Sequence, residues 1–295
     1  MRTETKQDIL SADELGTRYD QAAKQIWRNR EILAPLLKYV IKELNDETVE
    51  SIMALIDADT IRDDMPVSDL APTVIDRGTE QNSTTEMPIT YDLRFILKNP
   101  KLSVGKMLVM IHVDLEFQNK YRPVLKDGRS YSLITRGIYY AAREISSQLG
   151  RITEHTNYAD LEKVVSIWIV NDDIPCDIRN TATRYYFTKD DFIGETDEPK
   201  EEYDLMEVVI VRRGEDDGIT EPIFDYLKSV FDADLERIDK YTPASTNPEI
   251  VKEVSSMPGM SKVIYQNGVN DGVAQGMALG RSEGDSERKR LEDRI

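Results

Sequence analysis

The middle of the chain changes between strand and helix character, and this order restricts it to a mixed α/β fold. Met87–Leu97 and Lys106–Gln118 are rich in β-branched and aromatic residues, so each is predicted to form a strand. Ser130–Leu149 instead repeats apolar residues every three or four positions, which predicts an amphipathic helix. Leu161–Val170 is a short apolar run typical of a buried strand, and Pro72–Asp76 is a shorter candidate strand. With the helix predicted before them, the order is a helix, three strands, a helix and a strand.

The segments on either side of this core have patterns of their own. Apolar residues recur at helical spacing over Ile32–Leu44, and Asp46 is expected to cap a second helix after it. The polar stretch Asp57–Asp69, which contains a proline, is predicted to be a connector. Beyond the core, Leu205–Arg212 predicts a further strand and Glu221–Phe231 a further helix.

The chain has 295 residues, enough for about two domains at roughly 150 residues each. We expect a helical N-terminal lobe at 1–60, an α/β core at 61–190, an acidic α/β region at 191–260 and a helical tail at 261–295. Glycine recurs every four residues in that tail, at Gly268, Gly272, Gly276, Gly280 and Gly284. In a helix these form a stripe that lets a partner helix approach, so the tail is a candidate surface for a homo-oligomer. A frayed tail is the alternative, because each glycine costs a helix about 0.8–1 kcal/mol.

Charge is distributed unevenly along the chain. The 55 acidic and 38 basic residues give a net charge of −17, which by itself argues against nucleic acid as a partner. The excess lies in Asp190–Glu253, with 20 acidic and 7 basic residues, whereas Gln118–Arg151 has seven basic and two acidic residues. Screening limits distant charges to a range of about 10 Å, so this basic segment can still bind an anion. A solvated surface is the alternative interpretation.

Other features exclude several classes of protein. A single cysteine, Cys176, excludes an internal disulfide framework, and only two histidines, His112 and His155, make a His-rich zinc site unfavourable. No apolar run approaches the about 20 residues of a membrane helix, and the first residues lack the apolar stretch of an export signal. We therefore expect a soluble bacterial cytoplasmic protein with no membrane partner.

The candidate metal ligands are acids on two predicted strands. Residues i and i+2 of a strand share a face, so Asp114, Glu116 and Gln118 point the same way. Asp92 lies inside the preceding strand, where a charge is costly unless it meets water, a partner or a cation. If the strands are neighbours, Asp92 and Glu116 can reach a common Mg²⁺ or Mn²⁺, which prefer oxygen ligands. A solvated strand end is the alternative.

Five short segments also carry a resemblance to a known family, over roughly Asn29 to Tyr186. They are Tyr91–Phe95 (YDLRF), Asp114–Gln118 (DLEFQ), Ile134–Arg143 (ITRGIYYAAR), Ser146–Leu149 (SSQL) and Val165–Ile169 (VSIWI). Together they resemble the PD-(D/E)XK nucleases, and among these the bacterial PD-(D/E)XK nuclease family transposases, relatives of the recombination-promoting nucleases. The resemblance implies a restriction-endonuclease-like core at 61–190 and a metal-dependent DNA endonuclease that serves recombination or transposition.

The family motif implies roles for individual residues. Asp92 and Glu116 would be the catalytic, metal-binding acids, and Gln118 would orient the attacking water where many members have lysine. Glutamine offers a dipole instead of a charge, although Gln is common in this branch. Lys120 could supply the charge if the strand continued to it. The absent lysine and the net charge of −17 motivate a rival function, a degenerate nuclease fold that acts as a nucleic-acid- or protein-binding module or oligomeric adaptor.

The candidate DNA-binding residues are Lys120 and three residues of the helix after the third strand. Arg136, Tyr140 and Arg143 lie at positions i, i+4 and i+7, so they share one face of that helix. In the family core this helix lies beside the acids, where forked guanidinium groups would hold backbone phosphates. A salt bridge from these arginines to an acid such as Asp92 or Glu144 is the alternative.

Overall fold

A mixed six-stranded sheet forms the centre of the protein. The computed structural model describes residues 22–66, 90–101, 110–118, 120–125, 127–149, 158–214 and 221–257. The strands are β1 (Arg62–Pro66), β2 (Thr90–Lys98), β3 (Met110–Gln118), β4 (Lys163–Val170), β5 (Thr181–Tyr186) and β6 (Met206–Arg212). Their order across the sheet is β1-β2-β3-β4-β6-β5, with β3, β4 and β6 parallel and the other neighbours antiparallel. The α/β class predicted from the sequence is confirmed.

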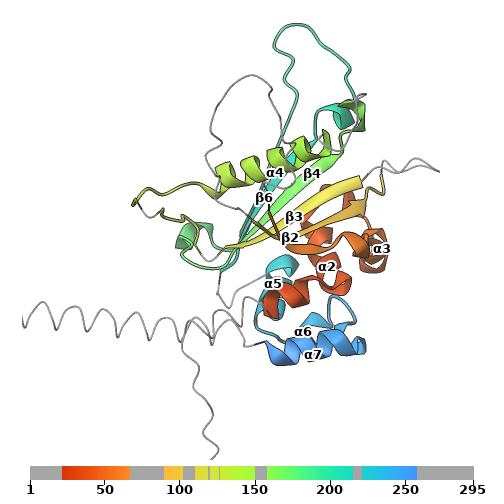
Figure 1. Cartoon of the computed structure of the whole chain (residues 1–295), viewed down its shortest axis with the longest axis vertical. Coiled ribbons are helices and arrows are strands. Elements are labelled where there is room, and N and C mark those ends of the chain that lie inside the picture. The colour runs from red at the N-terminus through yellow and green to blue at the C-terminus, as the bar shows by residue number, and fades with distance from the viewer. Residues whose placement is uncertain are drawn as a thin grey trace, which may run out of the picture.

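Helices cover both faces of this sheet (Figure 1). They are α2 (Arg30–Val40), α3 (Val49–Leu55), α4 (Leu133–Leu149), α5 (Pro222–Phe231), α6 (Leu235–Ile238) and α7 (Pro248–Ser256), and residues 22–27 are also helical. Short 3-10 helices are η1 (Lys42–Leu44), η2 (Ala58–Thr60), η4 (Tyr158–Asp160), η5 (Cys176–Ile178), η6 (Lys200–Glu202) and η7 (Ala244–Thr246). Helix α4 packs on β4 and β6, while α2, α3 and α5 lie on the opposite side (Figure 1). No helix in the described ranges combines the length and apolar character needed to cross a membrane.

The alternation of β3 divides its side chains between the two faces. Ile111, Val113 and Leu115 belong to the larger hydrophobic cluster, together with side chains of α2, α5 and α7. The even-numbered residues of β3 therefore face α4, where a smaller aromatic cluster includes Tyr140 and Trp168. Charged side chains of β3 are thus placed under a single helix, and this arrangement positions the candidate site.

Helix α4 approaches the sheet closely because it carries a glycine. A Cβ atom at Gly137 would lie 2.6 Å from Cγ1 of Val208 and 2.8 Å from Nε1 of Trp168. Both distances are shorter than van der Waals contact, so a larger residue would push α4 away from β4 and β6. The glycine therefore sets how near the helix lies to the acids of β3.

Elements from both sides of the predicted division at residues 190 and 191 contribute to the same sheet and the same hydrophobic cluster. Strand β6 comes from the region expected to be a separate acidic part, yet it lies between β4 and β5. Helix α5 from the same region packs on α2, where the Tyr226 hydroxyl donates to the carbonyl of Ile32 at 2.5 Å. The N-terminal helices and the C-terminal helices thus share one hydrophobic cluster.

Two local predictions are wrong, and two lie outside the described residues. The predicted connector Asp57–Asp69 contains β1, a polar edge strand without the apolar alternation that reveals central strands. The cap of α3 is Thr48, whose Oγ1 accepts from the Ser51 amide at 3.1 Å, and not Asp46. The candidate strand Pro72–Asp76 and the glycine-rich tail at 261–295 are among the residues that the structure does not describe.

Candidate active site at the carboxyl edge of the sheet

The structure brings Asp92 and Glu116 together where β2 and β3 stop pairing. The regular register between these strands ends at Leu93 and Leu115. Beyond that pair, the Asp92 amide donates to Oε1 of Glu116 at 3.0 Å, and the Phe117 amide donates to Oδ2 of Asp92 at 2.9 Å. Each carboxylate therefore takes the place of a backbone partner on the opposite strand. This reciprocal pairing places two acids at the point where the sheet opens.

Burial leaves the acids of β3 in an unfavourable environment for their charge. Glu116 and Asp114 are each only 1% exposed. Burial, together with the nearby charges of Asp114 and Asp92, raises the pKa of Glu116 well above its usual range. Burial likewise raises the pKa of Asp114 to about 7, although a hydrogen bond from Ser166 opposes the shift. Within the described part of the chain, Oδ1 of Asp114 has no hydrogen-bond partner. A bound cation would relieve this accumulation of negative charge.

Strand β4 holds Asp114 in place through a short chain of hydrogen bonds. Trp168 donates from Nε1 to Oγ of Ser166 at 2.7 Å, and Ser166 donates onward to Oδ2 of Asp114 at 2.6 Å. The sequence places Asp114 on the face of Glu116 but assigns it no role. Ser166 was not singled out, because its contact with Asp114 spans 52 residues of sequence.

The end of β3 separates Gln118, which lies on the strand, from Lys120, which does not. Gln118 is the last residue of the strand; it is half-buried, shares the face of Glu116, and accepts the Asn171 amide at its backbone oxygen at 2.9 Å. Lys120 lies beyond the strand and is exposed, so the idea that it continues the strand face is wrong. A positive charge near the acids comes from Lys24, which no local sequence pattern indicates. Its Nζ lies 3.4 Å from Oδ1 of Asp92.

The two predicted DNA-binding residues nearest the acids, Arg136 and Tyr140, form one aromatic assembly. Arg136 donates from Nη1 to the hydroxyl of Tyr131 at 3.1 Å and from Nη2 to that of Tyr140 at 2.6 Å. Its guanidinium also lies over the rings of Tyr140 and Trp168, at 5.1 and 5.2 Å. Tyr140 is fully buried, so its predicted contact with DNA is wrong; it orients Arg136 instead. Arg136 is the positive charge that interacts with Glu116.

Arg143 and Glu144, further along α4, have separate contacts. Arg143 is partly exposed and stacks on Tyr139 at 5.9 Å. Glu144 pairs with Arg94 of β2 and accepts from Nδ1 of His112 at 3.1 Å. The acid suggested as an alternative partner for the helix arginines is thus bound to residues of the sheet.

Arginines follow at the carboxyl ends of the parallel strands. Gln118 is aligned with Val170, and Val170 is aligned with Arg212, so these three residues form a row across β3, β4 and β6. Arg212 and its neighbour Arg213 are both buried. Ligands of open α/β sheets bind outside the carboxyl ends of the strands, and this edge also holds Glu116. No local sequence pattern indicates either arginine, because only the strand order brings β6 next to β4.

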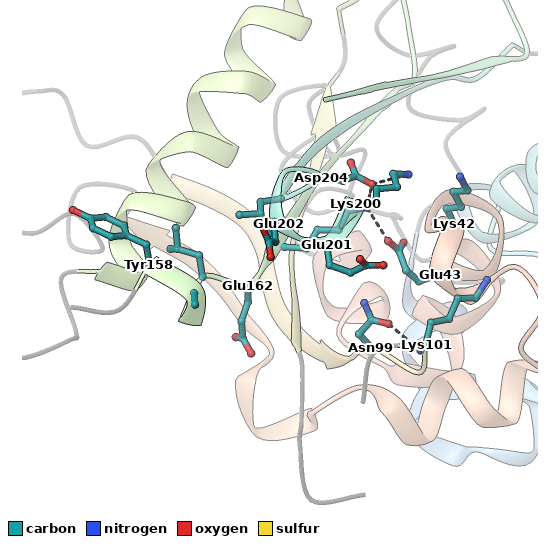
Figure 2. A pocket seen from close by; sticks show the side chains of 14 residues that line it. Lys42, Glu43, Asn99, Lys101, Tyr158, Glu162, Lys200, Glu201, Glu202 and Asp204 are labelled. Carbon is teal, nitrogen blue, oxygen red and sulfur yellow. Dashed lines mark hydrogen bonds and ion pairs between the residues drawn. The ribbon is translucent and has the colours of Figure 1, made fainter. Parts of the chain in front are cut away.

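A cavity of about 820 Å³ lies at the opposite end of the sheet and is lined by acids and lysines (Figure 2). Lys163 is buried there, with Nζ 2.8 Å from Glu43, 3.4 Å from Asp204 and 3.1 Å from Glu207. Lys200 pairs with Asp204 at 3.0 Å on the same wall (Figure 2). Lys163 and Lys200 each pair with acids at this end, while among the described residues Oε2 of Glu43 and Oδ1 of Asp204 are buried without a hydrogen-bond partner.

Comparison of the chain with models of protein families, with curated proteins and with solved structures gives no match.

Proposed function

We propose that the protein is a metal-dependent DNA endonuclease with a PD-(D/E)XK-like core, which hydrolyses phosphodiester bonds and serves recombination or transposition. The observation that carries the proposal is the reciprocal pairing of Asp92 and Glu116 at the opening between β2 and β3. The element order β1-β2-β3-α4-β4 and the sequence resemblance support the same assignment. A DNA strand would approach along the carboxyl edge, beside α4.

The donors at this edge suit a hard divalent cation such as Mg²⁺ or Mn²⁺. Asp92 and Glu116 supply carboxylate oxygens, and Oδ1 of Asp114 has no hydrogen-bond partner among the described residues. No group of three or more His, Cys, Asp or Glu within the described ranges could hold a metal. An ion bound by two carboxylates would therefore keep several waters, as Mg²⁺ commonly does. When bound, it would polarise the phosphodiester and lower the pKa of a bound water.

The remaining residues would position the substrate and the water. Gln118, on the face of Glu116, would hydrogen-bond the attacking water through its side-chain amide. Lys24, next to Asp92, would supply the positive charge that Gln118 does not provide. Arg136 and Arg143 would hold backbone phosphates, and the tyrosine contacts of Arg136 fix the plane of its guanidinium.

One observation favours the alternative of a degenerate nuclease fold that only binds nucleic acid or protein. Asp92 and Glu116 each already use one oxygen to accept a backbone amide, which makes both acids structural residues of the sheet as well. In that case the chain would bind DNA with the same affinity in the presence and absence of a divalent cation. Association through the glycine-rich tail belongs to this alternative.

Cleavage of supercoiled plasmid and of labelled single-stranded DNA with Mg²⁺ or Mn²⁺ tests the proposal. We expect nicking that EDTA abolishes and that is lost in Asp92→Ala and Glu116→Ala. Glu201→Ala removes an exposed acid from the opposite end of the sheet and is expected to cut like the wild type. Absence of cutting, or equal cutting by all variants, contradicts the nuclease assignment. DNA binding that persists without cutting would support the binding module.

A further inference from the structure

Arg212 ends β6 with a buried guanidinium whose contacts are all neutral. Its side chain belongs to a residue that is only 6% exposed. Nη1 donates to Oγ1 of Thr183 at 2.8 Å and to Oγ1 of Thr181 at 3.5 Å, and the guanidinium lies over the ring of Tyr121 at 5.6 Å. Among the residues that the structure describes, Nε of Arg212 is buried with no hydrogen-bond partner.

The other buried lysine and arginine side chains have contacts that Arg212 lacks. The buried lysine and arginine residues of the described ranges are Arg94, Lys163, Arg212 and Arg213. Arg94 pairs with Glu144, and Lys163 pairs with three acids. Arg213 donates from Nε to Asn171 at 3.3 Å and stacks on Phe231. Within the described structure, Arg212 is the one buried cation that has both an N–H without a hydrogen-bond partner and no ion pair with a carboxylate.

A buried charge without a counter-charge destabilises the folded protein unless a ligand compensates it. The ligand for a guanidinium with an unused N–H is an anion with several acceptor oxygens, and phosphate groups fit its forked donors. Thr183 and Tyr121 fix the guanidinium plane before any ligand arrives, so little side-chain entropy remains to be lost on binding.

The position of Arg212 relates it to the acids. Val208 and Ile210 of β6 belong to the cluster under α4, so the alternation places Arg212 on that same face. Gln118, Val170 and Arg212 form one row across three strands. Two strand spacings of about 4.8 Å place Arg212 roughly 10 Å from Gln118 along this row. A phosphate at Arg212 would therefore lie beside the acids and not on them.

We propose that Arg212 binds a phosphate of the DNA strand that flanks the phosphodiester bond to be cleaved. The identity of the ligand as DNA rests on the proposed nuclease function, whereas the preference for a phosphate group rests on the contacts of Arg212 alone. Arg212 thereby adds a positive charge to the edge where Gln118 has none.

Binding of a fluorescein-labelled DNA duplex, followed by anisotropy with Ca²⁺ at several salt concentrations, tests this site. Arg212→Gln is expected to weaken binding about tenfold and to reduce the slope of log K against log salt by about 1. Arg212→Lys keeps the charge but loses the fork, so it should bind at least about threefold more weakly with an unchanged slope. Arg237→Gln removes the same charge from a surface pair with Asp225 and should bind like the wild type.

The outcomes separate this site from the nuclease function. A folded Arg212→Gln with the wild-type slope overturns the phosphate site, even if the wild type cleaves plasmid. If Arg212→Gln does not fold, wild-type affinity in Arg212→Lys overturns it. If the wild type neither binds nor cleaves DNA, the nuclease proposal fails, and inorganic phosphate becomes the probe. A rise in Tm with phosphate in the wild type and Arg237→Gln, but not in Arg212→Gln, would then support the anion site; equal or absent shifts would overturn it.

Discussion

The two ends of the central sheet differ in how their buried charges are paired. At the end with the cavity, Lys163 lies among Glu43, Asp204 and Glu207, so cation and acids compensate each other within the fold. At the carboxyl edge, burial raises the pKa of both Asp114 and Glu116, and Arg212 has only neutral partners in the described structure. Paired charges contribute to folding, whereas unpaired buried charges cost stability until a ligand binds. The comparison therefore separates a structural end from a functional end.

Breaking the paired end should give the largest effect on stability. Lys163→Met removes the buried cation between three acids and leaves Glu43 without its ion pair, while Lys200 and Arg184 still pair with the other two. We expect the free energy of unfolding to fall by about 3–5 kcal/mol. Urea denaturation at pH 7 measures this loss. The matched control, Lys200→Met, removes a half-exposed lysine that pairs with Asp204 and lies over the ring of Tyr186, and it should cost less than about 1 kcal/mol. Equal losses in both variants would contradict the contrast between the buried and exposed pairs.

Removing an acid from the carboxyl edge should have the opposite sign. Because the folded pKa of Asp114 is raised to about 7, folding retains a proton that the unfolded chain releases, and stability falls as the pH rises from about 4 to 7. Asp114→Asn should therefore raise the free energy of unfolding by roughly 1–3 kcal/mol at pH 8 and by almost nothing at pH 4.

A divalent cation sharpens this second prediction. If Mn²⁺ binds the neighbouring acids, it lowers the pKa of Asp114 and the gain from Asp114→Asn shrinks in millimolar Mn²⁺. Denaturation curves with and without Mn²⁺ measure the change. A loss of stability at pH 8 in Asp114→Asn would show that the acid is compensated within the fold and would remove the contrast between the two ends.

The smallest effect is expected at His112, which lies on the α4 face of β3 between Glu144 and Glu162. Burial lowers its pKa, but hydrogen bonds with both acids outweigh burial, so the folded pKa is raised above 6.5. The stability from this charge is complete below pH 6.5 and is lost as the pH rises through the folded pKa. His112→Gln should cost about 1 kcal/mol at pH 6 and less at pH 8.5. His155→Gln is the control, and a loss that does not change with pH contradicts the charged state of His112.

Local sequence patterns predicted the elements that have a strong period of their own. The strands β2 and β3 alternate with period 2, the helices α4 and α5 have a period of about 3.6, and β4 and β6 are short continuous apolar runs, so each element follows from a short window of sequence. The polar edge strand β1 has no such pattern. The place of β6 in the sheet depends on pairing with strands distant in sequence, so no local pattern predicts that it lies between β4 and β5.

The residues of the candidate site also fall into two groups, those that a local pattern indicates and those that it does not. The i, i+2 rule and the family resemblance indicated Asp92, Glu116 and Gln118, and the structure places the two acids in contact. Lys24 and Arg212 were missed because each reaches the edge from an element distant in sequence. Tyr140 was misassigned because helical spacing defines a common face but does not tell which residue on that face is buried.

Calorimetric titration of Mn²⁺ into the protein at pH 8 tests the central claim, that the acids of the carboxyl edge form a cation site, most directly. We expect one Mn²⁺ per chain in the wild type and in Glu201→Gln, and no binding in Asp92→Asn or Glu116→Gln. Affinity should fall at pH 6, because the raised pKa of Glu116 makes protons compete with the metal. Equal binding by all four proteins, or no binding by the wild type, would contradict the account.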